Sequence, residues 1–255
     1  MTLPIFMNAP YGLVKDNIQR ILSLRIVGIE VYFNNNALDE AQTKDVKELG
    51  KMLGELGVKC TVHAPFMDLS PGGYDRTVRT ITKDKLKRSV ELANLLQALS
   101  VVCHPGYDRW RYDGNQKLWL DASIDTWTEV IREADKNLLV LVENIFEDEP
   151  STLIELFKNF QGKNLNFCFD SGHFNLFSRT PISDWLAPLK NRIREMHLHD
   201  NHGRSDEHLP IGMGTFPFRE LKTFVRQLDN IIYTIEIHRE SYANDSIKNL
   251  KEFLS

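Results

Sequence analysis

The chain has 255 residues, of which 42% are hydrophobic and 26% are charged, a composition typical of a soluble globular protein. Its 31 basic and 35 acidic residues leave a formal net charge of −4, which argues against a strong overall attraction to nucleic acid or an anionic membrane. No apolar run is long enough to span a bilayer, and the N-terminal MTLPIFMNAP has neither the basic nor the long apolar region of a signal peptide.

Short apolar runs typical of strands alternate along the chain with longer segments of helical periodicity. In chain order, strands are expected at residues 3–8, 28–33, 59–65, 99–104, 138–144, 165–170, 193–199 and 232–238. Helical patterns occupy residues 39–57, 86–99, 126–135, 151–160, 218–228 and 246–254. Gly57 suits the C-terminus of the first helix. Ser151 and Glu155 give the fourth an approximate capping box, one residue longer than the ideal spacing.

About eight strands alternating with about eight helices predict an α/β fold, a single-domain (β/α)₈ TIM barrel spanning residues 1–255. Several strands are apolar on both faces, as are parallel strands covered by helices. The alternative is an open doubly wound sheet, but no G-x-G-x-x-G turn follows a strand and the sequence has no P-loop. In such a barrel the carboxyl ends of the strands form the active site.

Three cysteines, Cys60, Cys103 and Cys168, lie inside apolar strand-like runs, and the sequence has no Cys-x-x-Cys pair. Reduced, buried thiols of a cytoplasmic protein are therefore expected, with thiolate ligation as the weaker alternative.

Seven of the eight histidines lie in five patches at the ends of strand-like runs, and none is expected on a helix. The patches are VHAPF (62–66), VCHPGY (102–107), CFDSGH (168–173), MHLHDNH (196–202) and TIEIH (234–238). A further run, LLVLVEN (138–144), ends in Glu143, and His208 follows in the loop segment DEH. Imidazoles and carboxylates at successive strand ends indicate a divalent-metal site.

Nine residues form the predicted ligand set: His63, His104, Glu143, Asp170, His173, His197, Asp206, His208 and Glu236. Mixed nitrogen and carboxylate ligands suit Zn²⁺ or Mn²⁺ and do not suit Ca²⁺. One catalytic zinc uses about three protein ligands, so this set indicates two or three ions bridged by a carboxylate such as Glu143. A lone strand-end histidine is more often an ordinary hydrogen-bonded residue, but nine such groups at one barrel mouth disfavour that interpretation.

Other polar residues near the strand ends have different expected places. His199 is predicted behind the ligands or against the substrate, His202 in a solvated loop and His238 at the barrel rim. The loop GYDRWRYDGNQKLW (106–119) is the predicted substrate-contact loop, through Tyr107, Arg109, Trp110, Arg111 and Tyr112. Cations and stacking surfaces suit nucleotides, phosphates or sugar rings. An aromatic flap packed on the barrel is an equal alternative.

The motif order HAPF, HPG, VEN, DSGH, HLHD, DEH-x-x-x-G-x-G and IEIH resembles the xylose-isomerase-like TIM barrels over about residues 3 to 240. These include endonuclease IV, the second family of apurinic/apyrimidinic endonucleases, and many sugar isomerases and epimerases. The resemblance to endonuclease IV implies three zinc ions on the nine residues above. The isomerases and epimerases hold one Mn²⁺, Mg²⁺ or Co²⁺, and their ligand set matches Glu143, Asp170, His197 and Glu236. Glu143 and Glu236 would then be the catalytic acid/base pair.

The chain departs from the endonuclease pattern. Gly212-Met213-Gly214 replaces the usual Gly-Glu-Gly, and the long basic DNA-gripping loops of the endonuclease are missing. Phe66 and Met67 match an endonuclease pair that enters the DNA stack, so Phe66 joins the predicted substrate contacts, although packing against the core is the favoured explanation.

Three hypotheses follow from the resemblance. The lead hypothesis is a multi-zinc phosphoester hydrolase acting on abasic-site DNA or a small phosphate ester, because the full ligand set is present. The alternative is a one-metal isomerase or epimerase acting on a sugar or sugar phosphate, which the acidic charge and short loops favour. A non-catalytic binding barrel is disfavoured, since such a module has little need of two facing glutamates. No membrane partner is expected.

Overall fold

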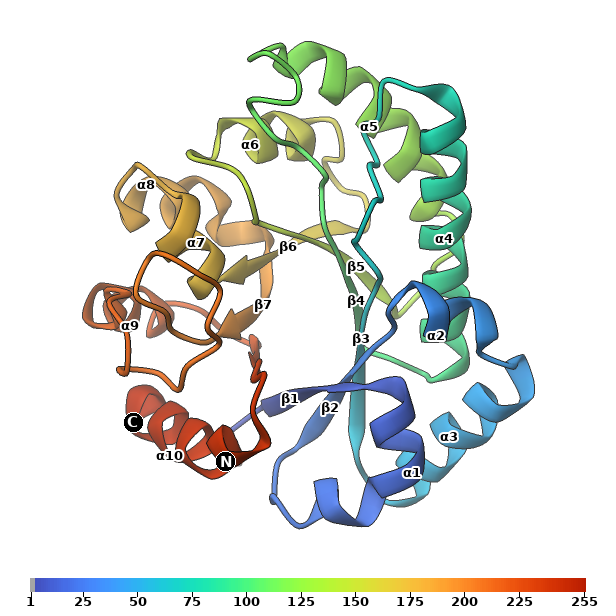
Figure 1. Cartoon of the computed structure of the whole chain (residues 1–255), viewed down its shortest axis with the longest axis vertical. Coiled ribbons are helices and arrows are strands. Elements are labelled where there is room, and N and C mark those ends of the chain that lie inside the picture. The colour runs from blue at the N-terminus through green and yellow to red at the C-terminus, as the bar shows by residue number, and fades with distance from the viewer. Residues whose placement is uncertain (1–2) are drawn as a thin grey trace.

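Eight parallel strands pair in chain order from β1 to β8, and β8 pairs with β1 to close a barrel. The strands are β1 (Ile5–Pro10), β2 (Gly28–Tyr32), β3 (Lys59–His63), β4 (Ser100–Cys103), β5 (Leu139–Glu143), β6 (Leu165–Asp170), β7 (Ile193–Leu198) and β8 (Ile232–Ile235). This computed structural model describes residues 3–255. Figure 1 shows the strands at the centre and the helices around them. The predicted (β/α)₈ TIM barrel is confirmed, with each strand within a few residues of its expected place.

The α-helices follow the strands along the chain and cover the outside of the barrel (Figure 1). They are α1 (Tyr11–Leu22), α2 (Asn35–Glu40), α3 (Thr43–Glu55), α4 (Arg76–Leu95), α5 (Gln116–Val130), α6 (Ser151–Lys158), α7 (Ser171–Phe177), α8 (Ile182–Leu189), α9 (Phe218–Val225) and α10 (Ala243–Leu254). Within residues 3–255, no helix is long and apolar enough to cross a membrane.

Several helix boundaries differ from the sequence prediction. The segment 39–57 contains the end of α2 and all of α3, because the backbone at Ala41 is extended. Gly57 ends this region with a φ of +69°, as predicted for a helix C-terminus. Helix α4 begins at Arg76 rather than at residue 86. The apolar residues of its first turns, Val78 and Ile81, are exposed, so this part of the helix has no buried apolar stripe from which the sequence could predict it.

The predicted capping box at the start of α6 is wrong. The Ser151 hydroxyl donates to Glu149, and the Glu155 carboxylate pairs with Lys158 instead of reaching back to the helix N-terminus. The extra residue of spacing explains the difference, because a carboxylate four residues on lies too far along the helix to complete the box.

Aliphatic and aromatic side chains fill the layer between the barrel and the helices. Trp119, Trp127 and Trp185 are completely buried there, and large buried rings supply much of the hydrophobic stabilisation of a domain. All three cysteines are buried and unpaired, which confirms the expected thiols, and burial raises the pKa of each. The barrel interior is different, because much of its lining is polar.

A candidate metal centre at the barrel mouth

The carboxyl ends of six neighbouring strands bring the predicted ligands together. His63, Glu143 and Asp170 are the last residues of β3, β5 and β6. His104 follows β4, His197 is the next-to-last residue of β7, Glu236 follows β8, and Asp206 and His208 lie in the loop between β7 and α9. Parallel strands that start at one end of a barrel must finish at the other, so the sequence places these side chains at one mouth.

His173 is a predicted ligand that lies on a helix, which was not expected. It lies in the first turn of α7, whereas no histidine was expected on a helix. The helix starts directly after β6, and the Asp170 carboxylate caps it by accepting the His173 backbone N–H at 2.6 Å. The cap points the first helical turn at the barrel mouth, so His173 still joins the cluster.

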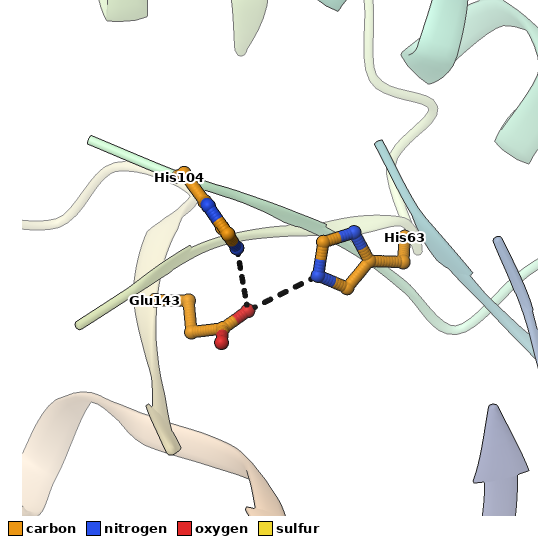
Figure 2. A group of neighbouring side chains, drawn as sticks. All are labelled: His63, His104 and Glu143. Atoms are coloured by element: carbon orange, nitrogen blue, oxygen red, sulfur yellow. Dashed lines mark hydrogen bonds and ion pairs between the residues drawn. The ribbon is translucent and has the colours of Figure 1, made fainter. Parts of the chain in front are cut away.

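Glu143 lies at the centre of four imidazoles. Its Oε2 atom is 3.2 Å from His63 Nε2, 3.4 Å from His104 Nε2 and 3.4 Å from His197 Nδ1. Its Oε1 atom is 3.0 Å from His173 Nδ1. Figure 2 shows the His63 and His104 nitrogens converging on the same Glu143 oxygen. Because imidazole nitrogens lie close to each of its two oxygens, this carboxylate has the geometry of a bridging ligand.

The other carboxylates extend the cluster across the mouth. Glu236 Oε1 is 3.2 Å from His197 Nδ1, and its Oε2 is 3.7 Å from His208 Nδ1. Asp206 Oδ2 is 2.9 Å from His208 Nε2 and 3.6 Å from His173 Nε2. With Asp170 Oδ1 at 3.4 Å from His173 Nδ1, all nine predicted ligands lie in one contiguous group.

Several buried nitrogen and oxygen atoms of the cluster make no hydrogen bond, which is what a site for a divalent cation requires. Six buried polar atoms of the cluster and the adjoining His199 make no properly oriented hydrogen bond within residues 3–255, although several lie close to an oppositely charged group: His104 Nε2, Glu143 Oε1, His197 Nδ1, His199 Nδ1, Asp206 Oδ1 and His208 Nδ1. Buried polar atoms are normally satisfied, so each such atom calls for a partner. Three triads, His63–His104–Glu143, His63–His197–Glu236 and His199–Asp206–His208, each place their ligand atoms within 4.8 Å of one another.

Carboxylates and imidazoles shift one another's pKa inside the buried cluster. Burial alone would raise the pKa of Glu143, but His197 and His104 hold it well below its usual range. Burial would lower the pKa of His63, but its hydrogen bond to Glu143 raises it to about 9. The pKa of His104 is instead lowered, because burial outweighs its carboxylate neighbour. Since only a neutral imidazole binds a metal, loading this centre would release protons.

Comparison with known proteins places the chain in a family. Residues 19–254 match the model of the xylose isomerase-like TIM barrels. The chain belongs to this family. It is 32% identical over 223 residues to an uncharacterized protein of Methanocaldococcus jannaschii, covering 83% of this chain and 75% of that protein. A second uncharacterized protein of the same organism is 30% identical over 206 residues, covering 77% and 78%.

Two solved structures resemble this xylose isomerase-like barrel along almost its whole length. A D-tagatose 3-epimerase-like protein is 28% identical with a TM-score of 0.84, covering 99% of this chain and 97% of its own. A Thermus thermophilus protein, from crystals soaked with ZnCl₂, is 25% identical with a TM-score of 0.80, covering 98% and 96%.

The remaining histidines of this xylose isomerase-like barrel lie around the cluster. His199 is buried behind Asp170, with its Nε2 3.0 Å from Asp170 Oδ2. Its ring stacks on His208 at 3.9 Å between centroids, and His208 stacks on the exposed ring of His238 at 3.7 Å. His202 is exposed and hydrogen bonds Glu207. These positions match the expected rim for His238 and the expected solvated loop for His202.

A buried carboxylate organises the loop that carries Asp206 and His208. Asp200 accepts four backbone N–H groups, from Asn201, Gly212, Gly214 and Phe216. Gly214 cannot be replaced without disturbance, because a Cβ there would lie 2.2 Å from the Asn201 carbonyl oxygen. Met213 between the glycines is half exposed, so the carboxylate usual at this position would face solvent here.

The predicted substrate contacts of the loop 106–119 and Phe66 divide into three groups. Phe66 stacks on His104, with 4.5 Å between ring centroids, and so lies beside the candidate metal centre. Tyr107 packs in the core against Tyr112 and Trp119, as in the alternative of an aromatic flap. From the same loop, Arg109 pairs with Asp148 at 2.7 Å, Trp110 is 81% exposed and Arg111 is exposed. Met67 is 64% exposed, which contradicts a core-facing role for it.

Sequence reasoning missed three carboxylates near the cluster. Glu30 on β2 and Glu195 on β7 are fully buried inside the barrel, and Glu147 is buried in the loop after β5. Burial raises the pKa of Glu147 and of Glu195 to about 7. A sequence signal exists in the carboxylate within an otherwise apolar strand run, as in GIEVY at residues 28–32.

Proposed function

We propose that this protein is a divalent-metal-dependent isomerase or epimerase acting on a sugar or sugar phosphate. The observation that carries the proposal is the pair of glutamates at one imidazole nitrogen: Glu143 Oε2 and Glu236 Oε1 lie 3.4 and 3.2 Å from His197 Nδ1. The 28% identity to a D-tagatose 3-epimerase-like protein over nearly the whole chain supports the same reaction class. This similarity favours an isomerase or epimerase over the hydrolase, which was the lead hypothesis only because all nine predicted ligands are present.

In this proposal one divalent ion, Mn²⁺, Mg²⁺, Co²⁺ or Zn²⁺, would be held by four residues: Glu143, Asp170, His197 and Glu236. The Asp170 Oδ2 atom is 3.9 Å from His197 Nδ1, which places the fourth residue of the set beside the other three. When bound, the ion would polarise the carbonyl and hydroxyl oxygens of the substrate and make the proton on the neighbouring carbon more acidic.

The two glutamates then divide the proton transfer. One carboxylate removes the proton from the carbon beside the carbonyl, and the electron pair moves toward the carbonyl oxygen. The other glutamate, which must enter the step protonated, gives its proton to the opposite face of that carbon for epimerisation. For isomerisation a proton is instead delivered to the former carbonyl carbon, while the proton of the neighbouring hydroxyl moves to the former carbonyl oxygen. The lowered pKa of Glu143 keeps its carboxylate ionised, which is the form that can accept a proton. Phe66 supplies an apolar surface next to His104.

Single-residue variants test this division of roles. Glu143→Gln and Glu236→Gln should abolish conversion of ketoses or ketose phosphates by the metal-loaded protein. His104→Ala and His208→Ala, which alter residues outside the proposed four-ligand set, should leave part of the activity. Complete loss in both histidine variants, with metal still bound, would contradict the one-metal proposal.

A multi-zinc phosphoester hydrolase is the second candidate, because His63, His104, Asp206 and His208 join the cluster although a one-metal isomerase does not require them. Metal analysis of protein purified without chelators or an affinity tag separates the two. Two or three zinc ions per chain, with hydrolysis of abasic-site DNA or small phosphate esters, would favour the hydrolase. One manganese, magnesium or cobalt ion would favour the isomerase or epimerase.

A further inference from the structure

A second polar layer lies inside the barrel beneath the metal centre. It contains Glu30 on β2 and Glu195 on β7, both fully buried. Ser100 Oγ and Thr234 Oγ1 each donate to Glu195 at 2.6 Å. Asn8 Nδ2 donates to Glu30 Oε1 at 2.8 Å. A sequence that places ionisable groups on inward-facing positions of the strands must satisfy them internally, because water is excluded there.

This layer is not a second ion site, although Glu30, Glu195 and His197 place potential ligand atoms within 4.8 Å of one another. Within residues 3–255, neither Glu30 nor Glu195 has a buried oxygen without a hydrogen-bond partner. The cluster above, with the adjoining His199, contains six such unpartnered atoms. The polar atoms of the lower layer are therefore satisfied by protein groups, whereas those of the cluster above fit a bound cation.

Glu30 contacts the metal centre from below by two routes. Its Oε2 atom is 3.2 Å from His197 Nε2, and the Asn8 amide that binds its other oxygen also lies 3.3 Å from Glu236 Oε1. Glu30 Oε1 accepts from the Asn8 amide, which leaves Oε2 to face His197 Nε2. A neutral His197 ring that donates its Nε2–H to this carboxylate presents its Nδ1 lone pair toward Glu143 and Glu236.

We propose that Glu30 is a positioning residue for the metal centre. It holds His197 as the tautomer whose Nδ1 lone pair faces the ion, and through Asn8 it orients Glu236. A carboxylate behind a ligating histidine fixes the ring and raises its basicity, and loss of such a partner weakens metal binding about 10–100-fold. The inference rests on the proposed function only in requiring that the centre bind a divalent ion.

Competition with a chromophoric chelator for Zn²⁺ tests the inference without an activity assay. Glu30→Gln should weaken Zn²⁺ binding about 10-fold or more, because a neutral amide can accept or donate and no longer selects the tautomer. Glu195→Gln is the matched control: it makes the same change in the same layer, but Glu195 lies 3.9 Å from His197 Nε2 and is held by hydroxyls. Its affinity should stay within about threefold of wild type on the same argument.

Asn8→Ala keeps the test decisive if Glu30→Gln does not fold, because Asn8 is only partly buried and its loss breaks the Glu30–Glu236 connection. It should weaken Zn²⁺ binding by a smaller factor. Wild-type affinity in both variants, or an equal loss in Glu195→Gln, would overturn the inference. A wild-type protein that binds no Zn²⁺, Mn²⁺, Mg²⁺ or Co²⁺ would instead overturn the proposed function, so the two failures are distinguishable.

Discussion

Replacing Asp200 with alanine tests whether one buried carboxylate holds the loop that carries Asp206 and His208. Asp200 Oδ1 accepts the N–H groups of Asn201 at 2.9 Å and Phe216 at 3.1 Å. Its Oδ2 accepts those of Gly212 at 3.0 Å and Gly214 at 2.8 Å. The alanine variant removes the acceptor from all four donors and leaves the backbone pair between Asp200 and Leu209 unchanged.

The size of the effect depends on how many donors water can reach. Gly212 is exposed, so its N–H can be hydrated, whereas Asn201 and Phe216 are buried and Gly214 is half-buried. Each buried donor left without a partner costs about 1–3 kcal/mol. The two buried donors and the half-buried one together predict a loss of about 4 kcal/mol in the free energy of unfolding on that scale. For a chain of this length the melting temperature should then fall by about 12 °C.

Thermal and urea unfolding of the metal-free protein measure this loss directly. Asp229→Ala, at an exposed position, is the control and should change the unfolding free energy by less than about 0.5 kcal/mol. Asp200→Ala should also weaken Zn²⁺ binding, since two of the predicted ligands lie in the released loop. A melting temperature within about 2 °C of wild type would refute the reasoning, because the four N–H bonds would then contribute nothing net.

Three further predictions concern burial and metal loading. Burial raises the pKa of Glu147 to about 7, so its protonated form favours the folded state: this stability is complete below about pH 4.5 and is lost as the pH rises through about 7. Glu147→Gln should therefore stabilise the metal-free protein at about pH 8 by up to about 3 kcal/mol, and an equal effect in urea titrations at about pH 4 would contradict this cause. Zn²⁺ at about 1,000 times its Kd should add about 4 kcal/mol and raise the melting temperature by about 10 °C, whereas no shift in a thermal scan would argue against a structured metal centre. Gly172→Ala would place a Cβ 2.0 Å from His199 Cε1, so it should lower both the melting temperature and Zn²⁺ affinity; wild-type values would show that the ring moves freely.

The barrel and most of the cluster could be predicted from the sequence because both depend on local order along the chain. Alternating strand and helix periods predict parallel strands, and parallel strands in a barrel end on one face. His63, Glu143 and Asp170 were therefore placed correctly without any knowledge of long-range contacts. The family model and the closed barrel confirm the fold that this placement assumed.

The parts that were missed depend on contacts between distant residues. Glu30 and His197 are 167 positions apart, and only the closure of the barrel brings their side chains within 3.2 Å. Periodicity predicts that residue 30 lies in a strand, but it does not show that the Glu30 side chain points into the barrel, where Asn8 and His197 are its partners. The packing of Tyr107 against Trp119 and the start of α7 at Ser171 likewise result from tertiary contacts and capping.

Solvent deuterium exchange tests the central proposal most directly. Ketoses and ketose phosphates are incubated in D₂O with protein loaded with Mn²⁺, Mg²⁺, Co²⁺ or Zn²⁺ in turn, and NMR follows the carbon beside the carbonyl. We predict deuterium incorporation at that carbon together with a new epimer or isomer, both lost in Glu143→Gln and Glu236→Gln. No exchange with any of these sugars, together with metal-dependent cleavage of abasic-site DNA or small phosphate esters, would contradict the account.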